Sequence, residues 1–263
     1  MGYTYSNTSI FLCLENREIA MYNYRNSKAN IINILKSKTP LEKKDTIPSD
    51  QEFTYENGII CWVSSIFVDM KNSSELFKTK DEKLARLLRA FTSEVITIFQ
   101  DFNKYNQIGI RGDCVYAIYS TPNKQDINQV FDVAVRVNTF MKMFNKLLSE
   151  NGYSNIGVGI GLGCDQQLII KAGRSGTGIN DKIWIGKAVV DASSLSSVAN
   201  RHGYKKIAMD SCFYNNLMHF SENKKEWFKC VDDLNYFNDV FYQCDVINIE
   251  FNKWIEDGMK NGS

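Results

Sequence analysis

Two long segments with the period of an α-helix alternate with apolar, β-branched runs along the middle of this 263-residue chain. Apolar side chains recur at spacings of three and four in residues 81–102, and residues 126–149 repeat that period, so both segments are predicted to be amphipathic helices. The runs between them are rich in β-branched and aromatic residues and are bounded by turn residues, as is typical of strands. The order β, α, β-β, α, β-β, α, β indicates an α+β fold: a mixed, mainly antiparallel sheet with helices packed on one face.

The individual strands are predicted from the points where these runs stop. The run IICWVSSIFVDM, residues 59–70, predicts a central strand that ends at a polar loop, and QIGIRGDCVYAIYS predicts a hairpin with its turn at Gly112 and Asp113. NIGVGIGLG and QQLIIKAG predict a second hairpin that turns near Asp165. The glycine-rich loop GRSGTGIND comes next; it lacks the G-K-[ST] ending of a P-loop and is interpreted as a flexible flap. Strand KIWIG, a helix over 187–200 and strand KKIAMD complete the pattern.

These patterns divide the chain into two parts. Residues 1–57 are predicted to form an N-terminal appendage, with one or two polar helices over 15–37 and a charged loop that contains prolines. Residues 58–263 are predicted to form one domain. Its last part runs from WFKCV through DVFYQCDVINI to a helix at KWIED and is expected to extend the edge of the sheet. A hydrophobic content of 44% is enough for a core of this size.

Charge and cysteine content narrow the range of partners. Lysine and arginine total 31 against 30 acidic residues, a net charge of +1, so no bulk attraction to nucleic acid or to an anionic membrane is expected. No run approaches the roughly 18 apolar residues of a membrane span. The seven cysteines are odd in number, form no C-x-x-C pair and lie mostly in apolar runs, as reduced, buried thiols do. A soluble, cytoplasmic protein is predicted.

Two aspartates stand where apolar runs end: Asp69 closes the first strand and Asp113 lies in the Gly-Asp turn. On neighbouring strands, these two carboxylates would meet beside the Ser/Asn loop that follows Asp69. Such a site suits two hard cations and a triphosphate, and oxygen-only ligation favours Mg²⁺ or Mn²⁺ over zinc. Taken singly, Asp69 could instead cap loop amides and Asp113 could be an ordinary turn residue. Together they predict a metal site for chemistry at phosphorus.

Four segments, in this order, carry a resemblance to a known family: IFVDMKNSS, GIRGDCVYAIYS, IGVGIGLG and IWIGKAVVDASSL. They resemble the class III nucleotide cyclases over residues 59–210, a family with a palm-like layout. The short form with W-[IV]-G-K-A-V is most similar to the pyrimidine cyclases of the Pycsar antiphage system, which make cyclic UMP or cyclic CMP. The resemblance implies that residues 58–263 form a nucleotide cyclase domain with a C-terminal edge extension.

The resemblance also implies how the site works. Asp69 and Asp113 would bind two divalent ions per site, Mn²⁺ or Mg²⁺, bridged by the backbone carbonyl of Met70. The loop that follows would offer amides to the phosphates of a nucleoside triphosphate, through the residues Asn72, Ser73 and Ser74. Family members build each site across a head-to-tail homodimer, in which one chain supplies the metal ligands and the other the wall that reads the base.

Two positions that read adenine in purine cyclases of this family are changed. The expected lysine is Gly109 and the expected polar residue is Ile183. Arg111, on the same strand face as Gly109, presents a fork of donors that suits the O2 or O4 of a pyrimidine, although an outward salt bridge is the alternative. Trp184 could border the base pocket or could be a core residue.

The asparagine and arginine that orient the ribose and stabilise charge in the family correspond to Val190 and Ser194. Arg174 in the glycine-rich loop and Lys187 at the start of the helix are the candidates to supply positive charge, with solvated surface charges as the alternative. Asp191, beside the asparagine position, could indicate a shifted register.

We therefore expect a metal-dependent pyrimidine nucleotide cyclase that converts UTP, or CTP, to the cyclic monophosphate and pyrophosphate for second-messenger signalling in antiphage defence. Two alternatives stay open at this point. One is an adenylate cyclase of the same fold. The other is a degenerate cyclase domain that binds a nucleotide without turning it over.

Overall fold

The computed structural model describes residues 22–260 except 79, 175, 220 and 221. The chain splits into two compact units, Met1–Lys38 and Thr39–Ser263. In the first unit, helix α1 (Tyr24–Lys36) begins where the Asn23 side chain accepts hydrogen bonds from two backbone amides of the first turn. This helix lies within the predicted helical segment 15–37, of which residues 15–21 lie outside the described part.

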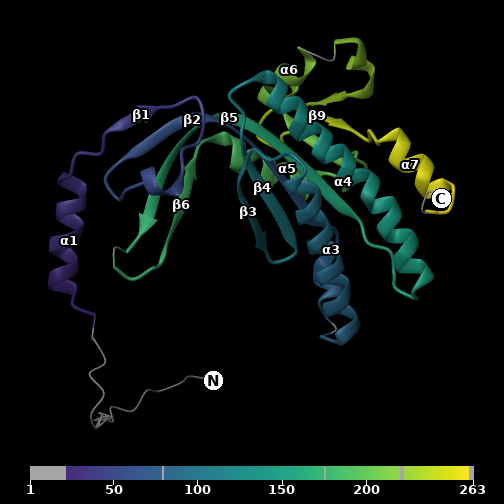
Figure 1. Cartoon of the computed structure of the whole chain (residues 1–263), viewed down its shortest axis with the longest axis horizontal. Helices are drawn as coiled ribbons and strands as arrows, with labels where there is room; N and C mark the ends of the chain where they lie inside the picture. The colour runs from purple at the N-terminus through teal and green to yellow at the C-terminus, as the bar shows by residue number, and fades with distance from the viewer. Residues whose placement is uncertain (1–21, 79, 175, 220–221, 261–263) are drawn as a thin grey trace, which may run out of the picture. The chain divides into compact units, whose positions relative to one another are not determined.

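The second unit is built on one mixed sheet, nine-stranded over the described residues, with the main strand order β3-β4-β2-β5-β7-β9-β8 (Figure 1). β1 pairs in parallel with the start of β2, and β6 pairs with the end of β5. β5 and β7 are also parallel, and the remaining pairs are antiparallel. The strands are β1 (Leu41–Lys43), β2 (Gly58–Met70), β3 (Tyr105–Arg111), β4 (Cys114–Ser120), β5 (Val158–Gly173), β6 (Asn180–Ile185), β7 (Ile207–Asp210), β8 (Lys229–Val231) and β9 (Phe241–Cys244).

Six α-helices of the described chain belong to this unit, with two short 3₁₀ helices at Asp50–Glu52 and Glu222–Trp227. The α-helices are α2 (Ser73–Leu76), α3 (Glu82–Gln100), α4 (Lys124–Glu150), α5 (Lys187–Val198), α6 (Ser211–Met218) and α7 (Ile249–Glu256). The predicted α+β fold, a mixed and mainly antiparallel sheet with helices packed on it, is confirmed. The tail also forms the predicted edge strands β8 and β9 and the final helix α7.

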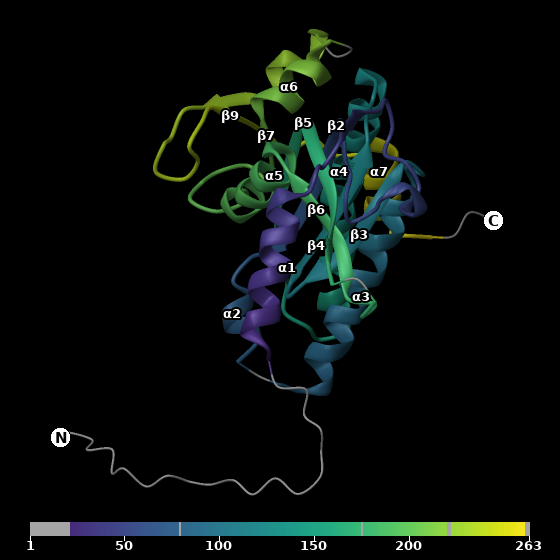
Figure 2. The same cartoon turned by 90° about the vertical axis from the view of Figure 1, so that its left-hand side faces the viewer.

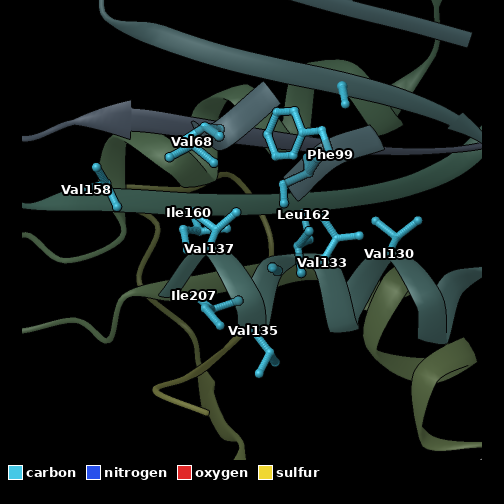
Figure 3. Packing of buried hydrophobic residues seen from close by; sticks show 14 of the residues in the cluster. Val68, Phe99, Val130, Val133, Val135, Val137, Val158, Ile160, Leu162 and Ile207 are labelled. Atoms are coloured by element: carbon cyan, nitrogen blue, oxygen red, sulfur yellow. The ribbon is translucent and has the colours of Figure 1, made fainter. Parts of the chain in front are cut away.

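One face of the sheet is apolar and lies against α3 and α4. Every second residue of β5 (Val158, Ile160 and Leu162) is buried in the main core, together with apolar residues from β2, β4 and β7. Figure 3 shows these side chains meeting valines of α4 and Phe99 of α3. The predicted face of α3 is confirmed, because its fully buried residues are Leu87, Phe91, Val95 and Phe99.

The opposite face is covered by α5, so the prediction that all helices lie on one face is wrong. Gly159, Gly161 and Gly163 alternate with the core residues of β5, and α5 lies directly on them. A Cβ at Gly161 would lie 2.0 Å from the backbone oxygen of Ala192. Figure 2 shows α5 on one side of the strands and α4 and α7 on the other. Glycine at every second position lets the helix backbone approach the sheet closely.

The predicted hairpin turn near Asp165 is also wrong. β5 runs without interruption from Val158 to Gly173, and Gln167 is fully buried opposite Cys61 of β2. The polar residues D-Q-Q therefore lie inside a long strand instead of at a turn. The turn lies further on, where the glycine-rich loop predicted to be a flap joins β5 to β6.

Residues 39–57, which the sequence groups with the N-terminal appendage, belong to the compact unit that follows. Ile47 and Phe53 are buried in a second apolar cluster with Ile59, Cys61 and Ile169. The parallel pairing of β1 with β2 continues this contact. The apolar positions of the segment are spaced irregularly between charges, which hides their burial from a search for helical or strand periods.

Two observations concern the thiols and the helices of the described residues, which exclude Cys13. The six cysteines in the described residues are free, and Cys61, Cys164 and Cys244 are fully buried. Among the same residues, no helix has the length and apolarity that crossing a membrane requires.

Candidate active site

The register of the sheet brings the two predicted aspartates together at one end of the neighbouring strands β2 and β4. Asp69, next to last in β2, lies opposite Cys114 of β4 on one side and Gly159 of β5 on the other. Asp113 immediately precedes Cys114 in the two-residue turn between β3 and β4, where Gly112 has φ 63°. This positive φ at the first turn residue is one that glycine adopts without strain. The turn thus places the second carboxylate next to the cross-strand partner of the first.

Burial and neighbouring charges act on the Asp69 carboxylate. Burial raises the pKa of Asp69 most strongly, and the Asp113 carboxylate raises it further, whereas the Arg201 guanidinium lowers it. Asp69 keeps only 23% of its side-chain surface exposed. A partly buried carboxylate beside a second one requires a cation to remain charged.

Arg201 provides that cation in this structure. Its Nη2 donates to Oδ2 of Asp69 at 2.7 Å and to the backbone oxygen of Met70 at 3.1 Å. Its Nη1 donates to the carbonyls of Ser196 and Ala199, at the end of α5, at 3.0 and 3.2 Å. The two oxygens held by Nη2 are the ones predicted to ligate the metal ions.

The main chain on either side of Arg201 is held firmly. Asn200 and His202 have φ of 59° and 51°, left-handed values that few residues other than glycine adopt. The Asn200 side chain donates to the carbonyl of Val158 at 3.0 Å, and the amide of Tyr204 donates to the carbonyl of Arg201 at 2.8 Å. The loop after α5 is thereby attached to the sheet, and the guanidinium reaches Asp69 from a fixed base.

The predicted phosphate loop follows Asp69 directly. Asn72 adopts φ 57° and ψ 30° and precedes the one-turn helix α2, whose first residues are Ser73 and Ser74. The Asn72 side chain makes no capping hydrogen bond to this helix. The first amides of a helix have no partner within it, so the loop can present amides as the sequence predicts.

A polar and aromatic wall lies on the sheet face that carries Asp69. Tyr116 of β4 covers Gly109, where an added Cβ would lie 2.5 Å from the tyrosine ring. Gln107 donates to the Tyr116 hydroxyl at 3.2 Å and accepts from the indole of Trp184 at 2.7 Å. Phe67 of β2 stacks on Tyr116 with ring centroids 5.0 Å apart. The position that holds lysine in the purine cyclases is therefore filled by a tyrosine ring.

Arg111 and Trp184 approach this wall from two strands. Arg111 is exposed and ends β3. Because every second residue of a strand points the same way, it shares one strand face with Gly109 and Gln107. Trp184 is partly buried on β6 against the second apolar cluster. Neighbouring strand residues point to opposite faces, so Ile183, 47% exposed, lies on the other face of β6. Within one chain, Ile183 and Trp184 do not line the same surface.

Two predicted cationic residues are placed away from Asp69 within the chain. Arg174 is exposed in the turn between β5 and β6, and Figure 1 shows this turn and the β3–β4 turn as separate tips. Lys187 is exposed at the start of α5, and its amide donates to the Asp165 carboxylate at 2.7 Å. The cation that the chain itself brings to Asp69 is Arg201.

The two positions that correspond to the family's asparagine and arginine differ in exposure. Val190 is 60% exposed on α5, and Ser194, one turn further on, is half-buried. Asp191 is half-buried, and burial raises its pKa.

Sequence reasoning missed three residues of this site: Gln107, Tyr116 and Arg201. Counting residues outward from the predicted turn identifies the first two, because a turn at 112–113 pairs Gly109 with Tyr116 and places Gln107 on the same face. Arg201 lies in a polar stretch after a helix, which gives no signal in one sequence.

The donor set decides what kind of ion would fit. No three His, Cys, Asp or Glu side chains gather into a ready cluster in the part of the chain that the structure describes. Two carboxylates and one carbonyl leave several positions for water and phosphate oxygens, as Mg²⁺ sites do. A divalent ion and a guanidinium 4 Å apart repel by about 8 kcal/mol at an effective dielectric of 20. An ion on Asp69 would therefore require Arg201 to move.

This geometry can be set beside known proteins. No protein-family model matches the chain. The adenylyl cyclase CyaB from P. aeruginosa superposes with a TM-score of 0.57 at 19% identity, over 70% of this chain and 93% of that one. The guanylyl cyclase Cya2 superposes with a TM-score of 0.57 at 12% identity, over 73% and 95% of the two chains. The fold is that of the class III nucleotide cyclases.

Curated relatives identify the family more narrowly. A uridylate cyclase of Treponema porcinum is 43% identical over 242 residues, 92% of this chain and 83% of the relative. A uridylate cyclase of Gulbenkiania mobilis is 28% identical over 250 residues, 90% and 96% of the two chains. The chain belongs to the uridylate cyclase family and is a nucleotide cyclase.

Proposed function

We propose that this nucleotide cyclase acts on UTP, with CTP as the second choice, and forms the cyclic monophosphate and pyrophosphate in a metal-dependent reaction. The observation that carries the proposal is the wall beside Arg111, where the Tyr116 ring occupies the space over Gly109. The relatives named uridylate cyclase support the same substrate. We further propose a cytoplasmic role in antiphage defence, which rests on the resemblance to the Pycsar cyclases.

The metal part of the proposal is supported by a cation already bound to the proposed ligands. The Arg201 guanidinium donates to Asp69 and to the Met70 carbonyl, and this pairing with a cation supports the proposed metal ligands. Asp69, Asp113 and the Met70 carbonyl would hold two Mg²⁺ or Mn²⁺ ions. When bound, such ions lower the pKa of the ribose 3′-hydroxyl and neutralise the triphosphate.

The chain's own groups then bind and orient the substrate. The amides of Asn72, Ser73 and Ser74 would contact the outer phosphates, because they follow Asp69 directly and begin a helix turn. Asp69 and Asp113 would hold the ions, which would supply positive charge for the α-phosphate and the ribose 3′-oxygen. Binding in this geometry lowers the barrier by pre-organisation.

The base is proposed to be read by Arg111. A guanidinium offers donors in a rigid plane, which matches the O2 or O4 of uracil, and the adjoining Trp184, Gln107 and Tyr116 are connected by hydrogen bonds that hold their orientation. The tyrosine ring leaves less room than a glycine alone would. A pyrimidine therefore fits this wall better than a purine does.

The active site is proposed to form across a head-to-tail homodimer. In a dimer of this kind, one chain supplies Asp69 and Asp113 and the partner supplies the wall at Arg111. Arg174 and Lys187, which lie away from Asp69 within a chain, would be able to approach the triphosphate only from the partner. In such a dimer, the sheet face of each chain would contribute its metal ligands to one active site and its base wall to the other.

The proposal is tested by incubating the purified enzyme with each of the four nucleoside triphosphates and Mn²⁺ and measuring product masses. UTP should give the most product. Arg111→Ala should lower kcat/KM for UTP by roughly 100-fold while changing the residual rate with ATP far less, because a pocket built for one base edge discriminates strongly. Arg89→Ala, an exposed arginine on α3, is the matched control. Turnover of ATP at least as fast as that of UTP and CTP would establish an adenylate cyclase instead.

A further inference from the structure

Arg201 holds the oxygens that the proposed metal ions require. Nη2 of this arginine donates to both Oδ2 of Asp69 and the Met70 carbonyl. Arg174, in the turn between β5 and β6, and Lys187, at the start of α5, are exposed and lie away from this carboxylate. The arginine comes from the loop after α5, so two distant segments meet at one carboxylate. This contact is specific, because one nitrogen spans a side-chain oxygen and a backbone oxygen of consecutive residues.

The other nitrogen of the guanidinium has partners of its own. Nη1 donates to the carbonyls of Ser196 and Ala199, which belong to the last turn of α5 and its end. Carbonyls at a helix C-terminus favour a cation. The guanidinium can therefore leave Asp69 and keep half of its hydrogen bonds.

The surroundings let the side chain move while the main chain stays. Arg201 and Asp69 keep 18% and 23% of their side-chain surfaces exposed, so solvent reaches the pair. The backbone at Arg201 is fixed by the Asn200 and Tyr204 hydrogen bonds to the sheet and within the loop. An ion can thus enter from solvent and replace the guanidinium without remodelling the loop.

We propose that Arg201 is an exchangeable counterion of the metal site, which occupies Asp69 and the Met70 carbonyl until a divalent ion displaces it. This inference rests on the proposed metal site. In this role Arg201 is a positioning residue: it keeps two partly buried oxygens paired and preformed in the metal-free enzyme, and it makes metal binding a replacement of one cation by another. The alternative is a permanent brace that ties the end of α5 to β2.

The experiment measures Mn²⁺ affinity of the full chain without nucleotide, from the electron paramagnetic resonance signal of free Mn²⁺. Because the arginine competes with the ion, Arg201→Ala should bind Mn²⁺ about 10-fold or more tightly than the wild type. Arg86→Ala removes the same charge from an exposed pair with Glu82 on α3 and should change the affinity less than about 2-fold. Equal or weaker Mn²⁺ binding by Arg201→Ala would overturn the exchange and leave the brace.

Two further variants separate the failure of this inference from failure of the metal site. Asp69→Asn and Asp113→Asn should each weaken Mn²⁺ binding at least about 10-fold; if both bind as the wild type does, the metal site itself is wrong. If both lose affinity while Arg201→Ala gains none, only the exchange is wrong.

A thermal measurement keeps the test decisive if Arg201→Ala folds poorly. An exchangeable counterion predicts that Arg201→Ala melts below the wild type in EDTA and that saturating Mn²⁺ restores its melting temperature. A brace predicts a loss that Mn²⁺ leaves in place. Arg201→Lys keeps the charge but cannot hold four oxygens at once, and it should fall between the two proteins in Mn²⁺ affinity.

Discussion

The two faces of β5 show how one strand serves two different purposes. On one face Val158, Ile160 and Leu162 fill the core against α3 and α4, and on the other Gly159 and Gly161 leave the backbone bare beneath α5. The bulky face supplies apolar burial. The bare face lets a helix approach so closely that the loop after it reaches Asp69. The comparison teaches that the site depends on side chains that are missing as well as on those that are present.

The largest expected effect comes from the two carboxylates of the proposed metal site. Asp69→Asn and Asp113→Asn should each lower turnover roughly 1000-fold, about 4 kcal/mol in barrier height, because metal ligation is lost while the neutral amide has nearly the same size. The measurement is kcat with UTP and Mn²⁺, with circular dichroism to confirm folding. Retention of more than about a tenth of the activity by both variants would refute the two-metal mechanism.

The next effect comes from the bare face itself. Gly161→Val should destabilise the protein by at least about 3 kcal/mol, because its Cβ would clash with backbone atoms of α5 that no side-chain rotation can move away. Urea unfolding measures this. Ser193→Ala is the control: this residue is exposed on α5, and the stability of the variant should differ from that of the wild type by less than about 0.5 kcal/mol. Equal stabilities for the two variants would mean that α5 does not need the bare strand.

A smaller effect is expected on the bulky face. Ile160→Val removes one methylene from the fully buried core and should cost about 0.5–1.5 kcal/mol of stability. Its kcat per folded molecule should equal that of the wild type, since Ile160 points away from Asp69. A lowered kcat at full folding would show that the two faces are coupled.

The smallest effect concerns a second aspartate at a strand end. Asp210 ends β7, and burial raises its pKa to about 7 despite hydrogen bonds from the amides of Cys164 and Phe213. A carboxyl group with a raised pKa in the folded state takes up a proton there first, so stability should rise as the pH falls. The expected gain is about 0.5 kcal/mol between pH 7.0 and 6.5. Asp210→Asn should remove this dependence, as urea unfolding at the two pH values would measure; an unchanged slope would mean that Asp210 is already ionised.

The sequence predicts most of the fold, because its signals are periodic. The faces of α3 and α4, the strand that ends at Asp69 and the Gly112–Asp113 turn each follow from spacing or turn chemistry. The predicted turn near Asp165 is wrong because three consecutive polar residues inside a long strand have the composition of a loop, whereas Gln167 is buried. The placement of α5 does not follow from local patterns, because glycine at every second strand position makes room for a helix without indicating which helix fills it.

The site could be predicted only in part, for a physical reason. Asp69 and Asp210 both close an apolar strand, IFVD and IAMD, and in the sequence they look alike. Their partners distinguish them. Asp69 accepts a hydrogen bond from a guanidinium, and the Asp113 charge raises its pKa, whereas Asp210 accepts hydrogen bonds from backbone amides. Those partners come from residues far along the chain, which local patterns do not bring together.

The pairing of β2 on both of its edges has a consequence for hydrogen exchange. β2 pairs with β5 along its whole length and with β4 along its second half. Amides in a strand that is hydrogen-bonded to a neighbour on each side exchange with solvent only when the whole domain unfolds, so their exchange rates should report the global free energy of unfolding. Asp69 is carried on this strand, and its backbone should stay in place through every local opening of the loops around it.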